Sequence, residues 1–147
     1  MGSARCTTGT AKRMEKTMKT RYGFGKTVAT SFADTVERVT QALQGEGFGV
    51  LTDIDVAATT KKKLSQDMPR YRILGACNPP LAQRAIAAEP SIGLLLPCNV
   101  VVRQDAAGKV HVEFMDPSAV LELVDKPQID QLGAEVRKWP ERVMASL

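Results

Sequence analysis

A strand that runs directly into two prolines sets the fold of this chain: YRILGACNPP, residues 71–80. The apolar run 71–76 predicts a buried strand. Proline has no backbone N–H to donate to a sheet, yet it fits the first turn of a helix, so Pro79 and Pro80 should end the strand and admit a helix. We expect that helix over about residues 81–88.

Upstream of this stretch, strand and helix patterns alternate. Phe32, Val36, Val39 and Leu43 recur at the three-to-four-residue spacing of a buried helical stripe, and a hydroxyl at residue 30 or 31 can cap that helix. The elements expected here are a strand over 16–28, this helix from about 30 to 45, an extended segment over 48–56 and a short lysine-bearing helix over 57–64.

Downstream, the quartet Asp105-Ala106-Ala107-Gly108 predicts the turn of a hairpin. It separates an apolar segment over 94–102 from a return strand over 110–115. In the return strand, Val110, Val112 and Phe114 alternate with His111, so the apolar set should face the core and His111 should be a solvated residue on the polar side.

The end of the chain predicts helices. A short one should run from Asp116-Pro117 to about residue 124, and a C-terminal one should follow, with Pro140 causing a kink or a break. No strand–helix unit repeats evenly and no Gly-x-Gly-x-x-Gly follows a strand, which disfavours a dinucleotide-binding fold. The predicted fold class is α+β: a single domain with an antiparallel or mixed sheet packed by helices.

Length and charge are those of one globular domain. The chain has 147 residues, of which 44% are hydrophobic and 24% charged. Its formal net charge of +4 is largely local, because Arg5, Lys12 and Arg13 all precede the first acidic residue. We therefore expect residues 1–17 to be a flexible tail and residues 18–147 to form the domain, and we do not expect nucleic acid as a partner.

The expected cellular location rests on two patterns that the sequence does not show, a membrane span and a secretory signal. No apolar run approaches the 18 or so residues that a membrane span requires, so a soluble protein without a membrane partner is expected. There is no secretory signal pattern and there are only three cysteines. A disulfide framework is therefore not expected, and the cytoplasm is the predicted location.

Two Cys-Asn pairs mark the candidate site: Cys77-Asn78, and Cys98-Asn99 located 21 residues later. Cys77 lies where a strand gives way to a proline-started helix, and a helix N-terminus favours the thiolate. The two thiols meet only if their strands are antiparallel, since a parallel crossover would place them at opposite ends. The alternative is that both cysteines are small core residues.

Other polar residues are weaker candidates for a functional site. Asn78 before a proline favours a turn or a cap, whereas Asn99 inside an apolar strand needs partners for its amide. Asp53 and Asp55 alternate along a strand and should share a face, where they and Lys63 form a second candidate ligand face. A solvated surface would give the same pattern.

A metal site has little support in the sequence. Cys77, Cys98 and His111 are the candidate ligands, but the spacing resembles no Cys-x-x-Cys pair, and His111 would also have to come near. No cofactor is indicated. No serine stands in a nucleophile motif with His111, so Ser-His-Asp hydrolysis is poorly supported.

Several separated motifs resemble the bacterial and archaeal family called domain of unknown function 302. They are Tyr22-Gly23-Phe24, EGFGVLTDID at 46–55, YRILGACNPP at 71–80, GLLLPCNV at 93–100 and Asp116-Pro117. The resemblance spans about residues 18–147. It implies a compact domain with a fold similar to the TATA-binding-protein class, often found as a homodimer. It supplies no substrate, cofactor or catalytic residue.

Three functions stay open, and the sequence does not decide whether the protein is an enzyme. The first is a homodimeric domain that binds a small ligand near Cys77, Asn78, Cys98 and Asn99. The second is a thiol- or sulfur-handling enzyme or carrier, with Cys77 as nucleophile and Cys98 as resolving thiol. The third is a structural or protein-interaction module.

Overall fold

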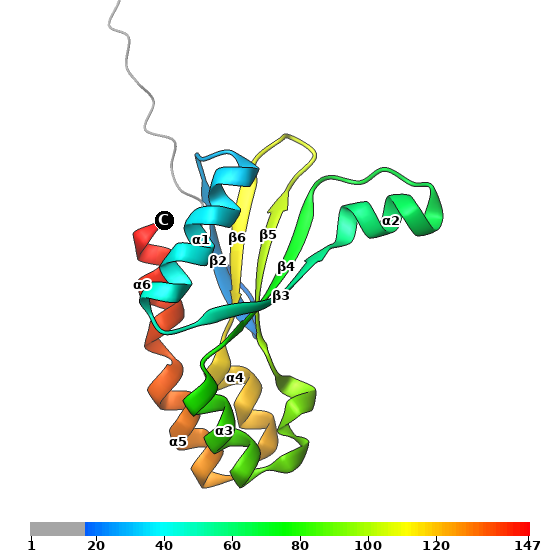
Figure 1. Cartoon of the computed structure of the whole chain (residues 1–147). Helices are drawn as coiled ribbons and strands as arrows, with labels where there is room; N and C mark the ends of the chain where they lie inside the picture. Colours follow the sequence, from blue (N-terminus) through cyan, green and yellow to red (C-terminus); the bar gives the residue numbers. More distant parts are fainter. Residues whose placement is uncertain (1–16) are drawn as a thin grey trace, which may run out of the picture.

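The structure, a computed structural model, describes residues 17–147 and has one six-stranded sheet, in the order β1-β2-β6-β5-β4-β3 (Figure 1). All neighbouring strands are antiparallel. The predicted α+β class is therefore confirmed. The strands are β1 (Thr17–Lys19), β2 (Gly23–Val28), β3 (Gly49–Asp55), β4 (Tyr71–Cys77), β5 (Cys98–Gln104) and β6 (Val110–Met115).

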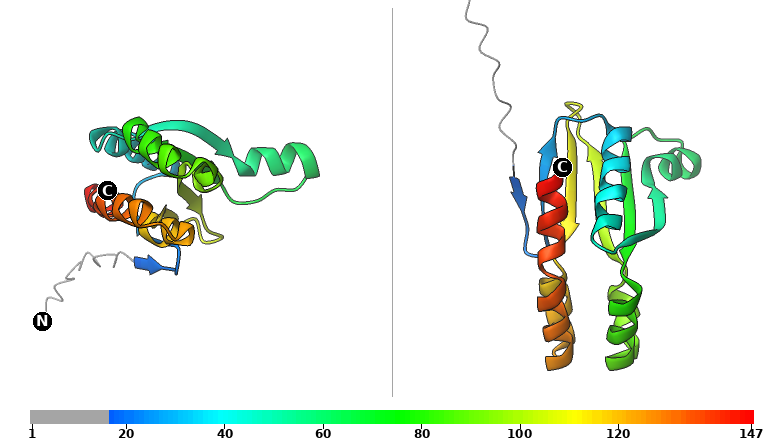
Figure 2. Two further views of the ribbon diagram at one scale, coloured as in Figure 1. Left: turned by 90° about the horizontal axis from the view of Figure 1, so that it is seen from below. Right: turned by 60° about the vertical axis from the view of Figure 1, so that its left-hand side comes forward.

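The helices gather on one face of the sheet and beyond one of its ends. Helix α1 lies along the sheet with α6 beside it, while α3 and α5 lie side by side past the sheet's end (Figure 2). Helix α2 projects from the β3 edge (Figure 1). The helices are α1 (Phe32–Gly45), α2 (Val56–Leu64), α3 (Pro79–Ala88), α4 (Pro117–Leu121), α5 (Pro127–Val136) and α6 (Lys138–Ser146), with 3-10 turns η1 (Pro90–Leu95) and η2 (Glu122–Val124).

The main core lies between the sheet and helices α1 and α6. Alternate residues of the central strands, such as Leu74, Val100 and Val112, are buried against Val39 and Leu43 of α1. Each such side chain contributes roughly 1.5–3 kcal/mol by leaving water. A smaller core beyond the end of the sheet joins α3, η1, α4 and α5 through Ala85, Ile92, Leu121, Ile129 and Leu132.

Three predicted boundaries differ from the structure. The segment expected as one strand over 16–28 forms two strands, because the chain turns where the Thr20 N–H donates to the Gly23 carbonyl at 2.8 Å. The apolar run at 94–102 begins in η1, since Pro90 starts a helical turn, and becomes a strand only at Cys98. The expected tail, 1–17, lies outside the described residues except for Thr17, which already belongs to β1.

The C-terminal helix is broken, three residues before the proline that was expected to break it. Helix α5 ends at Val136 and α6 begins at Lys138. Pro140 has no N–H to bond to the Val136 carbonyl, and its ring crowds that oxygen. The interruption therefore falls at residue 137, and Pro140 is accommodated inside the first turn of α6.

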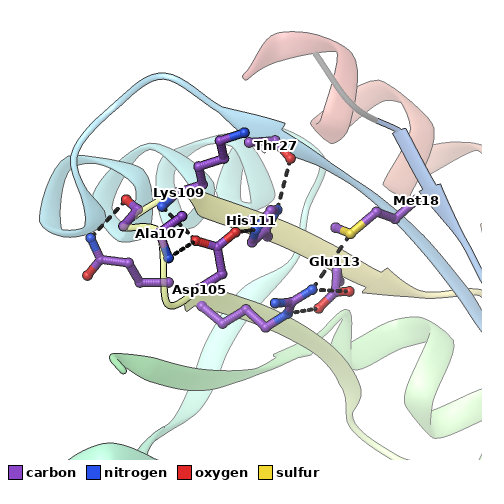
Figure 3. Close-up of polar contacts among 10 residues, drawn as sticks. Met18, Thr27, Asp105, Ala107, Lys109, His111 and Glu113 are labelled. Carbon is purple, nitrogen blue, oxygen red and sulfur yellow. Dashed lines mark hydrogen bonds and ion pairs between the residues drawn. The ribbon is translucent and has the colours of Figure 1, made fainter. Parts of the chain in front are cut away.

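His111 is buried, which corrects the expectation of a solvated residue. Its side chain lies between β2 and the β5–β6 turn, and only 7% of the residue is exposed (Figure 3). His111 Nδ1 lies 2.9 Å from Thr27 Oγ1, and Nε2 lies 2.7 Å from Asp105 Oδ2. These two partners replace the water that a solvated imidazole would bind.

Asp105 serves both the histidine and the hairpin turn. Its Oδ1 accepts the N–H groups of Ala107 at 2.9 Å and Lys109 at 3.0 Å, while Oδ2 is bonded to His111. The hydrogen bond with His111 is the largest cause that lowers the pKa of Asp105 below its ordinary value. An ionised carboxylate only accepts, so His111 Nε2 carries the donated proton.

Gly75 of β4 has no side chain at a point where Thr52 and Pro97 approach the strand closely. A Cβ built at this position would overlap Thr52 Oγ1 and would lie 2.7 Å from Cγ of Pro97. The Thr52 hydroxyl can rotate away, but the Pro97 ring cannot. Gly75 therefore allows Pro97, and with it the start of β5, to lie against β4.

We expect Gly75→Ala to lower the free energy of unfolding by about 1–3 kcal/mol, because the added methyl group overpacks this junction. Gly49→Ala is the matched control in β3, since a Cβ there meets nothing within 4 Å. Chemical denaturation of both variants checks the prediction. Equal stabilities for the two would show that Pro97 is not held against Gly75.

We expect Asp105→Asn to destabilise the protein at pH 7. The pKa of Asp105 is lowered in the folded state, so its contribution is complete above its ordinary pKa and is lost as pH falls through the lower, folded value. The stability difference from native protein should therefore shrink below about pH 4. Urea unfolding at pH 7 and pH 3 measures it, with Asp67→Asn, from an exposed ion pair with Lys61, as control. A difference that does not depend on pH would contradict the carboxylate's role.

Candidate functional site

A cavity of about 310 Å³ lies where β4 ends and β5 begins, between the end of the sheet and helices α3, α4 and α5. Its walls are apolar, with Leu81 and Ala82 from α3 and Leu132 from α5 among them. Both cysteines of the described chain, Cys77 and Cys98, line it. None of the lining residues is charged, so any molecule inside is offered hydrophobic contact and a few neutral polar groups.

The antiparallel pairing of β4 and β5 puts the two cysteines at the same end of the sheet. Ala76 is the partner of Cys98 in the register, so Cys77 is the residue next to that pair. The strands are antiparallel, as the thiol hypothesis requires, but consecutive residues of a strand point to opposite faces, so the register puts the Cys77 side chain on the other face from Ala76 and Cys98. Both cysteines are free thiols, each partly exposed as a whole residue.

The thiol of Cys98 is held in its protonated form. Burial raises its pKa to about 11, and the neighbouring Cys77 adds to the rise. Burial acts in this direction because an apolar environment disfavours the charged thiolate. At neutral pH, Cys98 is therefore a neutral group on an uncharged wall.

The two asparagines of the Cys-Asn pairs lie in different places. Asn78 caps α3, since its Oδ1 accepts the N–H of Leu81 at 3.2 Å, and it lines the cavity. Asn99 is the partner of Gly75 and lies on the opposite face of the sheet, where it is exposed and lines a second, more polar pocket of about 680 Å³ with Val101 and Arg103. The cavity site thus contains Cys77, Asn78 and Cys98 without Asn99.

The acidic and basic candidates lie away from the cavity. Asp53 accepts a hydrogen bond from Arg72 Nε at 2.7 Å in a two-point ion pair, and this hydrogen bonding is the main cause that lowers its pKa. Asp55 caps α2, accepting the N–H of Ala58 at 2.9 Å. Lys63 is exposed in the last turn of α2. These side chains have structural or surface positions, and none lines the cavity.

The structure separates His111 from the cysteines. His111 is the partner of Arg103, five residues along β5 from Cys98, which corresponds to about 16 Å at the rise of an extended strand. The polar cluster around His111 (Figure 3) therefore belongs to the other end of the sheet. A site formed by Cys77, Cys98 and His111 is not supported. Among residues 17–147, no group of three or more His, Cys, Asp or Glu side chains is placed to hold a metal ion.

The cavity walls were not identified from the sequence. They come from segments far apart in the chain, including Leu51 of β3, Pro97 before β5 and Leu121 of α4. Each of these is an ordinary apolar residue whose pattern predicts core packing. Leu51 differs from the others in the structure, since it falls at an irregularity in the β3–β4 pairing and 67% of it is exposed, but neither feature is visible in the sequence.

The fold and the cavity define a class of protein, an α+β domain with an apolar pocket at one end of an antiparallel sheet. Residues 24–147 match the model of the family described as Domain of unknown function DUF302, and the chain belongs to that family. An uncharacterized conserved DUF302 protein from Bacillus stearothermophilus has a similar crystal structure, with a TM-score of 0.78 and 26% sequence identity over 85% of this chain and 97% of that one. No curated protein matches the chain. None of the helices described between Thr17 and Leu147 has the length and apolar character for crossing a membrane.

We expect Cys98 to resist alkylation in native protein. Raising its pKa from 9.0 to about 11 reduces the thiolate fraction near neutral pH by about 100-fold. A pulse of iodoacetamide at pH 8, followed by peptide mass spectrometry, should label the Cys98 peptide far more slowly than the Cys77 peptide. Labelling in denaturant should make the two rates similar. Fast labelling of Cys98 in the native state would contradict its burial.

Proposed function

We propose that this domain binds a small, uncharged and largely apolar molecule in the cavity at the end of the sheet. The observation that carries the proposal is the lining itself: about 310 Å³ bounded by apolar side chains and by no charged one. Ligand sites commonly enclose about 300–1,000 Å³, with apolar walls and few polar groups. The cavity falls at the lower end of that range.

The polar groups of the site limit what the ligand can be. The polar side chains of the lining are the Thr52 hydroxyl and the Asn78 amide, and Oδ1 of Asn78 already accepts the Leu81 N–H. A charged group placed inside would lose its hydration without gaining an ionic partner, which is costly. The proposed ligand therefore buries a neutral hydrocarbon or aromatic part.

A thiol- or sulfur-handling activity is a second candidate, because Cys77 and Cys98 line the same cavity as free thiols. Its weakness is Cys98, since the raised pKa leaves little thiolate to serve as a resolving group near neutral pH. A purely structural or interaction role is the third candidate. A structural or interaction role requires no ligand, and it does not explain why an apolar, uncharged cavity is present.

We further propose that the domain works as a homodimer in the cytoplasm and does not use nucleic acid as a partner. Pairing of two copies rests on the resemblance of the sequence motifs, which implies a domain that is often a homodimer. Exposed apolar side chains such as Tyr22, Leu51 and Ile54 are available for it, at 68%, 67% and 50% exposure. The similarity of the fold to the TATA-binding-protein class stays a prediction.

We expect Ala82→Phe to abolish binding of a neutral apolar probe by filling the cavity. Ala82 lines the cavity, whereas Ala87 of the same helix is exposed and outside the lining, so Ala87→Phe is the matched control. The measurement is titration with N-phenyl-1-naphthylamine, whose fluorescence rises in apolar surroundings. Native protein and Ala87→Phe should bind it, and Ala82→Phe should bind at least about tenfold more weakly, a loss of 1.4 kcal/mol or more.

The single tryptophan of the chain provides a second measurement of probe binding, through its own fluorescence. Trp139 is buried and stacks on Phe48 at a centroid distance of 4.1 Å, and Phe48 lines the cavity. Probe binding should therefore change Trp139 emission in native protein and in Ala87→Phe, but not in Ala82→Phe. Equal binding by the two phenylalanine variants would overturn the proposal.

A further inference from the structure

The pocket that Asn99 lines lies on the face of the sheet that α1 and α6 do not cover. Its volume is about 680 Å³, larger than that of the cavity. On β5, Val100 is buried in the core, so the alternate residues Asn99, Val101 and Arg103 point to the other face. Glu113 of β6 is the register partner of Val101 and shares this face. Strand alternation therefore builds a pocket whose side chains are independent of the core.

An ion pair lies in the wall of this pocket. Arg103 Nε donates to Glu113 Oε2 at 2.9 Å, and Nη2 donates to Oε1 at 3.3 Å. The two side chains are only 28% and 31% exposed. Of the residues from Thr17 to Leu147 that line the pocket, no other carries a charge. A charged ligand would lose its hydration here and find its counter-ion already paired, so a neutral ligand is favoured.

Two polar groups of the pocket can still form hydrogen bonds. Nη1 of Arg103 and the side-chain amide of Asn99 have no hydrogen-bond partner among residues 17–147. A guanidinium nitrogen only donates, whereas an asparagine amide both donates and accepts. The two residues are four positions apart on β5, which places their Cα atoms about 13 Å apart in an extended strand. The pocket therefore offers a hydrogen-bonding group at each of two separated points.

The part of the pocket between these two points suits a flat ring. Val101 lies between Asn99 and Arg103 on the strand, and it gives the pocket an apolar floor. Tyr22 and Tyr71 also line the pocket, and aromatic side chains pack favourably against other rings in offset or edge-to-face arrangements.

We propose that this pocket binds a neutral aromatic molecule with a hydrogen-bonding group at each end. One end carries an acceptor for Arg103 Nη1, and the other carries a hydroxyl or amide for Asn99. Among the described residues, Met115 alone lines both this pocket and the cavity. The ligand is therefore a second one, and the proposal does not rest on the apolar ligand of the cavity.

The test compares three probes of nearly one shape at pH 7. They are 4-hydroxybenzamide, which is neutral, 4-hydroxybenzoate, which is an anion, and 4-hydroxybenzylamine, which is a cation. Each is titrated into the ¹⁵N-labelled full chain while the backbone amide signals of Val101 and Glu113 are followed. The neutral probe should bind most tightly, with a Kd of about 1 mM for so small a molecule.

Two variants test the two ends of the proposed ligand. Glu113→Gln keeps the shape of the side chain but leaves Arg103 without its counter-ion, so the preference should move from the neutral probe to 4-hydroxybenzoate. Asn99→Leu should weaken binding of 4-hydroxybenzamide by about fivefold, the effect of losing one hydrogen bond. Gln131→Leu is the matched control, since Gln131 is exposed on α5 and lies outside the pocket.

Any of three results would overturn the proposal: no signal shift at Val101 or Glu113, an unchanged probe preference in Glu113→Gln, or equal binding by Asn99→Leu and Gln131→Leu. Where a variant does not fold, the order of the three probes on native protein decides, and tighter binding of either ion would overturn it. Ala82→Phe should leave the shifts at Val101 unchanged. The cavity ligand and this second ligand therefore fail separately.

Discussion

The pairing of β4 with β5 is the constraint on which the site depends. These strands are neighbours within the sheet, and their register joins Ala76 to Cys98 at the end where the chain leaves the sheet after β4 and re-enters it at β5. Prolines act on both sides of that point: Pro97 precedes β5, and Pro79 follows β4 after the Asn78 cap. Because proline cannot extend a ladder, the pairing cannot slide past this point, and a shift of one residue would turn Cys98 away from the helices.

From this junction the chain leaves the sheet for the helices beyond its end. Helices α3 and α5 are joined there by a two-point ion pair between Arg84 and Glu135, at 2.9 and 3.1 Å. The pair is exposed and adds little stability. The relative placement of the two helices comes instead from the buried apolar cluster that Ala85 of α3 shares with Ile129 and Leu132 of α5.

The sequence predicted the fold well where periodicity is strong. The helical stripe from Phe32 to Leu43 and the alternation around Val112 both correspond to observed elements. The prediction was wrong where the deciding contact is distant. The burial of His111 depends on Thr27, a partner 84 residues away, and an alternating strand pattern contains no information about it.

The site was predicted in part for the same reason. The Cys-Asn pairs pointed to the end of the sheet where the cavity lies, but their members separate: Asn78 has left β4 to cap a helix, while Asn99 is still in β5 and faces away from Cys98. The apolar walls gave no sequence signal, since a residue that lines a cavity and one that fills a core follow the same pattern. Only three-dimensional placement distinguishes Leu132 in the wall from Ile129 in the core.

The two ends of the sheet have opposite chemistry: one end is polar and hydrogen-bonded, and the other is apolar and contains the cavity. At one end, Asp105, His111 and Thr27 form a connected polar chain that ties the β5–β6 turn to β2 (Figure 3). At the other end, the lining offers no charge and leaves space between the sheet and the helices. A cavity reduces dispersion contacts and weakens the structure around it. The main core of α1, α6 and the central strands lies between the two ends, so changes at the cavity can alter what it accepts while the polar end keeps the strands in register.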